Sequence, residues 1–255
     1  STNTTSTSDS AITITFDGGN LAPGANTTFV YYSSLAAELT TSTSTSTSAL
    51  FDSIVEGVDG GTDTINSALS ITLPDNVENV ALSGSGAING VGNSLNNVLT
   101  GNSAANILKG LGGDDTLLGG GGSDSLTGGT GDDIFRYTNT SDGGAVATNV
   151  IASTANISGD TIFDFVSGTD KLEFASNAFG NLSTGALASG LFVDLNEAYD
   201  GTNSGLASGS KAFILDSTNK LYFDSATDTS GQDSNEGYSV IAANLDLVAT
   251  DITII

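Results

Sequence analysis

The sequence contains no cysteine, methionine, histidine or tryptophan, and only five of its 255 residues are Lys or Arg. The absence of cysteine excludes disulfide bonds and thiolate metal sites, and a chain that also lacks methionine has little to oxidise outside a cell. The absence of histidine excludes a Ser-His-Asp triad and a His-Glu-x-x-His zinc helix. Pairs of carboxylates can hydrolyse glycosides, but in so acidic a chain they arise by chance. We therefore predict that the protein is not an enzyme and has no catalytic residues.

Negative charge dominates the composition, with 29 acidic residues and a net charge of −24. Folding concentrates this repulsion, and bound divalent cations would offset it. Nucleic acid is excluded as a partner because binding phosphates needs a basic patch. An anionic membrane surface is disfavoured for the same reason, and no apolar run approaches the roughly 20 residues of a membrane helix. The composition therefore predicts metal ions as ligands, without nucleic acid binding or membrane insertion.

The first 50 residues differ from the rest in their residue pattern. Ser1–Ser10 carries no positive charge and no apolar run, so it is not a secretory signal; either a signal was removed or the export address lies elsewhere. Alternation predicts a strand at Ile12–Phe16, and Phe29–Tyr32 is a second candidate. The tract Thr40–Ser48 is either a flexible linker or an edge strand. We expect residues 1–50 to form an N-terminal β arm that serves assembly.

A nine-residue repeat occupies the middle of the chain. Each block begins with glycine, has Asn or Asp at its sixth position and has an apolar residue at its eighth. The leading residues are Gly92, Gly101, Gly110, Gly119 and Gly128; the sixth are Asn97, Asn106, Asp115, Asp124 and Asp133; the eighth are Leu99, Leu108, Leu117, Leu126 and Phe135. A repeat of fixed period indicates a stacked solenoid, and abundant glycine with few prolines disfavours long helices. The prediction is an all-β fold.

Each block is expected to form a glycine loop followed by a short strand. In the block from Gly119, glycines permit the positive-φ backbone of a tight loop, and Ser125–Thr127 follows as a strand. Two blocks then make one coil, so loops two blocks apart stack on the same side. We expect Asp115 to lie over Asp133 at one edge, and Asn106 beside Asp124 at the other.

This stacking suits calcium, a hard cation that takes six to eight oxygen ligands at about 2.3–2.6 Å. Glycine loops expose backbone carbonyls, and each sixth-position Asp adds a carboxylate. Magnesium resists such a site because it demands strict octahedral geometry, and zinc would require His or Cys. Several calcium ions are predicted. The ligand-bearing residues are predicted to be Gly110, Gly112, Gly113, Asp115, Gly119, Gly120, Gly122, Asp124, Gly128, Gly129, Gly131 and Asp133, with Asn97 and Asn106 contributing less charge.

The block resembles the Gly-Gly-x-Gly-x-Asp-x-apolar-x nonapeptide of the RTX calcium-binding family. Residues Gly128–Arg136 match it in full, the block from Gly119 also matches, and the block from Gly110 departs only at Leu111. The resemblance implies a parallel β-roll with calcium between its loops.

The flanks are similar to the same family. Residues 61–65 and 73–79 look like a lead-in to the repeats; residues 159–172 look like a cap, whose Asp160, Asp164 and Asp170 join the predicted ligands. Residues 213–224 and 251–255 look like a C-terminal domain read by type I secretion machinery. The implied organisation is an arm at 1–50, a lead-in and RTX β-roll at 51–137, and a β-rich cap with the type I secretion domain at 138–255, with antiparallel β elements flanking the roll. The implied location is outside a bacterium or on its surface.

Three functions remain open at this point. Repeats and export address fill most of the chain, so the folded β protein is itself the expected product: a self-assembling subunit of an extracellular layer resembling an S-layer, a filament or a matrix. Unpaired strand edges favour such association. The alternatives are a monomeric calcium-dependent binding module, such as an adhesin or ice binder, and a fragment of a larger RTX protein.

Overall fold

The computed structural model describes residues 11–16, 27–32, 62–139, 142, 159–179, 181–194, 212–217, 219–224, 237–242 and 247–255. Within these residues the regular structure consists of β-strands and two 3₁₀ turns, η3 (Ser189–Leu191) and η4 (Ala249–Asp251), without an α-helix. The same residues contain no helix long and apolar enough to span a bilayer. The prediction of an all-β fold is confirmed.

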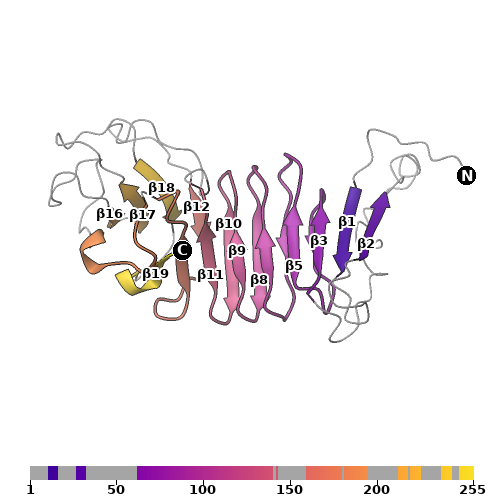
Figure 1. Cartoon of the computed structure of the whole chain (residues 1–255), viewed down its shortest axis with the longest axis horizontal. Helices are drawn as coiled ribbons and strands as arrows, with labels where there is room; N and C mark the ends of the chain where they lie inside the picture. The colour runs from indigo at the N-terminus through magenta and orange to yellow at the C-terminus, as the bar shows by residue number, and fades with distance from the viewer. Residues whose placement is uncertain are drawn as a thin grey trace, which may run out of the picture.

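The middle of the chain winds into a roll with two parallel sheets, whose strands lie side by side along the long axis (Figure 1). The first sheet contains β3 (Thr64–Ser67), β5 (Asn79–Leu82), β7 (Val98–Thr100), β9 (Thr116–Leu118), β11 (Ile134–Tyr137) and β13 (Lys171–Phe174). The second contains β4 (Ile71–Thr72), β6 (Gly90–Val91), β8 (Ile107–Gly112), β10 (Ser125–Thr130) and β12 (Asp160–Ile162). Successive strands along the chain alternate between the sheets, so that two strands make one coil.

The eighth-position side chains form the core between the sheets. Leu99, Leu117 and Phe135 from the first sheet join Leu108 and Leu126 from the second in one hydrophobic cluster, each with 0% of its surface exposed. Flanking strand residues point outward, because side chains alternate across a strand. Each strand thus contributes a short buried stretch, and stability depends on stacking many coils.

The strand register confirms that two blocks make one coil. Leu99 pairs with Leu117, and Leu117 with Phe135, in the first sheet; Leu108 pairs with Leu126 in the second. The next pairing in the second sheet joins Leu126 to Ile162. The connection between β11 and β12, which we call the excursion, is therefore longer than one block, and the roll resumes after it.

Antiparallel strands flank the roll at both ends, as predicted. At the N-terminal end, β1 (Ala11–Phe16) pairs with β2 (Thr27–Tyr32) and with β3, which confirms both strands expected there. At the other end β18 (Gly237–Ala242) continues the second sheet in parallel, and β17 (Lys220–Asp224) and β16 (Ala212–Leu215) follow in antiparallel order. The remaining strands are β14 (Gly185–Ala186), β15 (Phe192–Asp194) and β19 (Ile252–Ile254).

Two details differ from expectation or lie beyond it. Within the predicted cap, the β-like segment 161–165 forms a strand only as far as Ile162, because the chain turns there and brings Asp164 onto the loop at Gly128 and Gly129. The tract Thr40–Ser48 lies outside the described residues. The proposed domain boundaries stay predictions.

Leu111 occupies a strained position in the block that begins at Gly110. It stands where the two following blocks have Gly120 and Gly129, and all three adopt positive φ: 89° for Leu111, 84° for Gly120 and 117° for Gly129. A bulky side chain is disfavoured in this region of backbone space. The side chain is 48% exposed, so packing gives little compensation.

Replacing Leu111 by glycine is therefore expected to stabilise the roll. Relief of strain contributes about 1–3 kcal/mol, and the added backbone entropy of glycine costs roughly 0.5–1 kcal/mol, so a gain of about 1 kcal/mol should appear in urea unfolding at saturating calcium. Leu95→Gly is the matched control, because Leu95 is a loop leucine outside the positive-φ set. Equal losses of stability in both variants would contradict the assignment.

Candidate metal sites along the two edges of the roll

The loops between strands stack into two columns, which we call the first edge and the second edge. The first edge comprises loops 73–78, 92–97, 110–115, 128–133 and 163–170, each of which leads from the second sheet to the first. The second edge comprises loops 68–70, 83–89, 101–106, 119–124 and the excursion that ends at Asp160. Every sixth-position residue lies at the end of its loop, so the columns bring these side chains into register.

On the first edge the sixth-position carboxylates form a ladder. The backbone N–H of Asn97 donates to Oδ1 of Asp115 (2.7 Å), and that of Asp115 donates to Oδ1 of Asp133 (2.9 Å). The N–H of Asp133 donates in turn to Oδ1 of Asp170 (3.0 Å). Each carboxylate thus reaches back to the preceding coil.

The second edge repeats this arrangement. The N–H of Asn106 donates to Oδ1 of Asp124 (2.7 Å), and that of Asp124 donates to Oδ1 of Asp160 (2.8 Å). The structure therefore places Asp115 over Asp133 on one edge and Asn106 beside Asp124 on the other, as the two-block coil predicts. It also brings Asp160 and Asp170 into the columns, although they lie outside the nine-residue pattern.

The leading glycine of each block is required by the carboxylate that folds back over it. A Cβ at Gly110, Gly119 or Gly128 would collide with Oδ2 of the sixth-position aspartate of the same block. The second- and fourth-position glycines serve the loop itself; Gly122 and Gly131, for example, have φ values of 116° and 138°. Glycine therefore has two separate roles in this repeat.

The ladder leaves buried carboxylate oxygens without partners. Asp115, Asp124 and Asp160 are at most 1% exposed, and Oδ2 of each has no hydrogen-bond partner. A buried oxygen left unsatisfied costs about 1–3 kcal/mol, and more when it is charged. Of the two ion pairs formed by described residues, Arg136–Glu173 and Lys171–Asp251, neither involves these three aspartates. A cation is the missing partner.

Burial also perturbs the pKa of the ladder carboxylates. It raises the pKa of Asp115 to about 7, although the N–H of Asn97 acts in the opposite direction and nearby Asp133 adds to the rise. Burial likewise raises the pKa of Asp124 and Asp133 to about 6, and that of Asp160 to about 8 with a further contribution from Asp124. Burial therefore disfavours the ionised form of these carboxylates, and a bound cation would offset that penalty.

The donor set fits calcium. Besides carboxylates it consists of backbone carbonyls, and those of Gly110, Gly119 and Gly128 lie against the preceding coil at Gly92, Gly101 and Gly110. Among the described residues, no group of three acidic side chains is placed to hold one metal ion, so carbonyls must supply most ligands of each ion. Oxygen-only sites of this mixed kind are what calcium accepts. When bound, calcium would supply charge neutralisation between adjacent coils.

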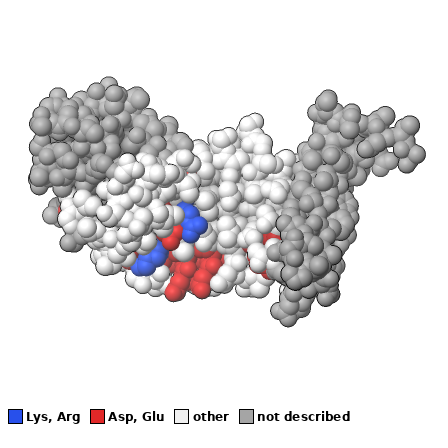
Figure 2. All heavy atoms as spheres, in the orientation of Figure 1, with Lys and Arg blue, Asp and Glu red and all other residues white. Residues whose placement is uncertain are grey.

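Acidic side chains also reach the surface along one margin of the roll. Figure 2 shows this acidic patch beside a few basic side chains on an otherwise neutral face. On the first edge, exposed Asp114 and Asp132 belong to an outer ladder, in which the N–H of Asp132 donates to Oδ1 of Asp114 (2.9 Å) and the N–H of Asp114 donates to Oδ1 of Asn96 (2.9 Å). These bonds add alignment between coils without burying charge.

Asp164 and Asp170 finish the first edge in different ways. The carboxylate of Asp164 accepts hydrogen bonds from the N–H groups of Gly128 (3.0 Å) and Gly129 (2.8 Å), so it closes the last glycine loop. Asp170 accepts from Asp133 through Oδ1 and from the N–H of Val166 (2.7 Å) through Oδ2. The ligand role of each predicted residue stays a prediction.

Sequence reasoning missed Tyr137 and Asp142 at the end of the second edge. The Tyr137 hydroxyl is buried without a hydrogen-bond partner, and burial, with the charges of Asp160, Asp124 and Asp142, raises its pKa well above the usual value. Oδ2 of Asp142 accepts from the N–H groups of Thr138 and Asn139, both at 2.8 Å. Neither residue follows the nine-residue period, so no sequence signal marked them.

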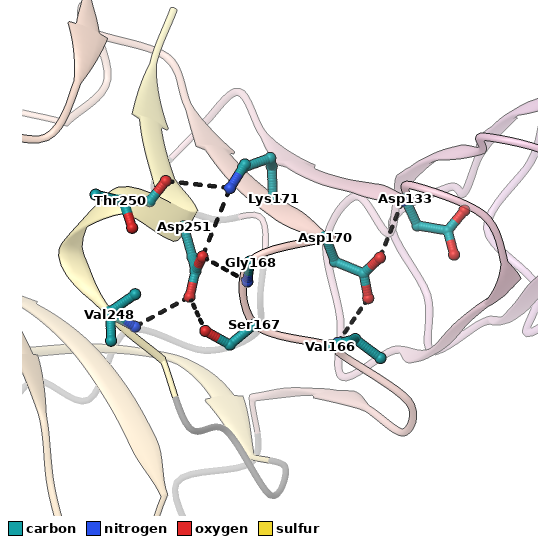
Figure 3. A network of polar contacts seen from close by, with 9 residues as sticks. All are labelled: Asp133, Val166, Ser167, Gly168, Asp170, Lys171, Val248, Thr250 and Asp251. Carbon is teal, nitrogen blue, oxygen red and sulfur yellow. Dashed lines mark hydrogen bonds and ion pairs between the residues drawn. The ribbon is translucent and has the colours of Figure 1, made fainter.

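The loop that carries Asp170 is also tied to η4, the turn that directly precedes the C-terminal strand β19 (Figure 3). Asp251 accepts from the Ser167 hydroxyl (2.6 Å) and the N–H of Gly168 (3.0 Å) and pairs with Lys171 (3.5 Å). Burial would raise the pKa of Asp251, but the bonds from Ser167, Val248 and Gly168, together with Lys171, lower it. The last rung of the first edge and the final strand therefore share one loop.

The raised pKa values predict how the metal-free protein responds to pH. Folded Asp115, Asp124 and Asp133 hold protons that the unfolded chain releases near pH 4. Because the folded state binds more protons, its stability falls as pH rises from about 4 to about 7. Urea unfolding in metal-depleted buffer should give a higher midpoint at pH 5 than at pH 8.

Saturating calcium should reverse this trend, because metal binding displaces the protons. A metal-free midpoint that rises with pH over the same range would contradict the assignment of these carboxylates.

Comparison with known proteins identifies the repeat. The family model described as RTX calcium-binding nonapeptide repeat (4 copies) matches residues 91–126 and 100–135. No curated protein matches the chain. The solution structure of the AlgE6R3 subunit from the Azotobacter vinelandii mannuronan C5-epimerase is similar, with 25% identity and a TM-score of 0.34 over 67% of this chain and 80% of that chain. The segment 91–135 consists of RTX nonapeptide repeats, which bind calcium at multiple sites, and it folds as a parallel β-roll.

Proposed function

We propose that this chain is a secreted structural protein whose calcium-loaded roll associates with further copies into an extracellular layer, filament or matrix. The observation that carries the proposal is the pair of columns of buried, unpartnered carboxylates. They make the aspartate-bearing coils conditional on a cation that is scarce in the cytosol and abundant outside the cell. Extracellular calcium modules bind with dissociation constants near 10⁻⁴–10⁻³ M, so these coils would fold after export.

Open sheet edges support association. Within the described residues, β2 ends the first sheet and β4 ends the second, each with one neighbouring strand. An outer strand presents unpaired backbone groups to another chain. The charge of −24 would keep metal-free copies apart, and bound calcium would lower that barrier. Calcium would therefore control both folding and association.

The N-terminal strands are the proposed contact. Full-length protein in millimolar calcium should form large species, and a variant without residues 1–50 should bind calcium equally but stay small, because it has lost β1 and β2. Light scattering and negative-stain microscopy measure both, and a metal-free sample of each is the control. A full-length protein that stays monomeric at high concentration would favour the alternatives: a monomeric binding module, or one domain of a larger RTX protein.

Export through a type I secretion system is the second part of the proposal. In the fold, Asp251 is 0% exposed and β19 pairs with β13, so the C-terminal segment is accessible to a transporter only before the cap closes. Deleting residues 245–255 should leave the protein in cells that carry a type I exporter, and Asp251→Asn, which weakens the anchor but keeps the segment, should be exported like the wild type. Equal export of the deletion variant would argue against this route.

A further inference from the structure

We propose that the side-chain amides of four asparagines take the place of calcium in the N-terminal coils, so that this part of the roll forms without metal and templates the calcium-dependent coils. The residues are Asn93 and Asn97 on the first edge and Asn102 and Asn106 on the second. They occupy positions two and six of the two blocks that share the pattern Gly-Asn-Ser-x-x-Asn. The inference concerns which loops bind metal, and it does not depend on secretion or assembly.

On the first edge, amide groups fill the gap between loops 73–78 and 92–97. Nδ2 of Asn93 donates to the carbonyl oxygens of Pro74 (2.8 Å) and Val77 (2.7 Å) in the preceding coil. Nδ2 of Asn97 donates to Oδ1 of Asn93 (3.1 Å) and to the Val77 carbonyl (3.4 Å). Partial positive charge on the amide hydrogens thus meets carbonyl oxygens, the ligands that a cation between two loops would use.

On the second edge, the gap between loops 83–89 and 101–106 is filled in the same way. Nδ2 of Asn102 donates to the carbonyl of Gly86 (2.9 Å), and Nδ2 of Asn106 donates to that of Ile88 (2.6 Å). The two asparagines are also linked, because the N–H of Asn102 donates to Oδ1 of Asn106 (2.8 Å). Both side chains are at most 9% exposed, so these bonds form away from water.

The side chains in the asparagine gaps have hydrogen-bond partners for both their oxygen and nitrogen atoms, whereas aspartate side chains in the later gaps keep an oxygen without a partner. Oδ1 of Asn93 accepts from the N–H of Leu95 (2.9 Å) and Oδ1 of Asn97 accepts from that of Asn93 (2.7 Å), so both ends of each amide are bonded. Asp115 and Asp124, one coil further on, each keep a buried oxygen with no partner. Their blocks have Leu111 and Gly120 at position two, where no amide can donate.

The two kinds of gap are separated along the roll. Each edge has one asparagine-filled gap, and every gap on its C-terminal side carries aspartate. Parallel coils are costly to start because each strand pairs with residues far away in the sequence. A preformed coil would remove that cost for the coil that follows. Calcium-driven folding would then proceed in one direction, from β7 and β8 towards β13.

Hydrogen exchange of the full-length protein tests this directly. In chelator, amides of residues 79–109 should remain protected while those of residues 113–137 exchange freely; in millimolar calcium both segments should be protected. Equal protection of the two segments in chelator, whether high or low, would overturn the proposal. The readout requires neither assembly nor export, so it fails or succeeds separately from the proposed function.

A pair of variants on the second edge separates the two roles. Asn106→Ala removes the donor to Ile88, so in chelator the amides of residues 79–109 should exchange about tenfold faster, as expected when one or two net hydrogen bonds are lost. Its calcium stoichiometry at saturation should equal that of the wild type. Asp124→Asn should do the reverse, lowering bound calcium by titration calorimetry while leaving the metal-free protection of 79–109 unchanged.

Asn93→Ala repeats the first arm on the other edge, in case Asn106→Ala fails to fold in chelator. Loss of a bound calcium ion in either asparagine variant would mean that the asparagine is itself a ligand, and the proposal would be wrong.

Discussion

The roll depends on one contact, in which the sixth-position side chain of a loop accepts the backbone N–H of the equivalent residue in the preceding coil. On the first edge it links Asn97, Asp115, Asp133 and Asp170 in succession. The contact aligns the coils but uses only one carboxylate oxygen, and the other lies buried beside the leading glycine of its own block. The same side chain therefore aligns adjacent coils through one oxygen and requires a cation near the other. Charge that opposes folding without metal becomes, with calcium, the reason that adjacent coils hold together.

Much of this could be predicted because the nine-residue period carries it. The recurrence of Leu117 and Phe135 predicted a stacked solenoid, and the spacing of Asp115 and Asp133 predicted which loops stack. Wherever the chain leaves the period, prediction was weaker. Asp160 was recognised only through a family resemblance, and Tyr137 was missed because nothing in its spacing distinguishes it. The separate roles of the glycines are visible only in the fold, since composition does not reveal that a carboxylate folds over Gly110.

Asparagine at position six is a second case in which the sequence alone does not predict the role of a residue. From the sequence, Asn97 and Asn106 look like weaker copies of the aspartates, because an amide differs from a carboxylate mainly in charge. In the fold the direction of the hydrogen bonds differs as well: an aspartate side chain accepts hydrogen bonds from the preceding coil, whereas these amide groups donate hydrogen bonds to it. The second-position asparagines complete the arrangement, and a motif of two coupled positions is not visible when each is compared with a consensus separately. Our proposal for the N-terminal coils rests on this reversal.

In the regular repeat, the number of coils is proportional to the number of residues, and the excursion between β11 and β12 breaks that proportion. Asp124 and Asp160 are 36 residues apart, twice the spacing of Asn106 and Asp124, yet they make the same contact. Neighbouring strands lie about 4.8 Å apart, so the length of the roll is set by the number of coils and not by the number of residues. The additional residues between Asp124 and Asp160 therefore leave the spacing of the coils along the roll unchanged. Residues can therefore be inserted in a loop of the roll without changing the distance between its two ends, because that distance depends only on the number of coils.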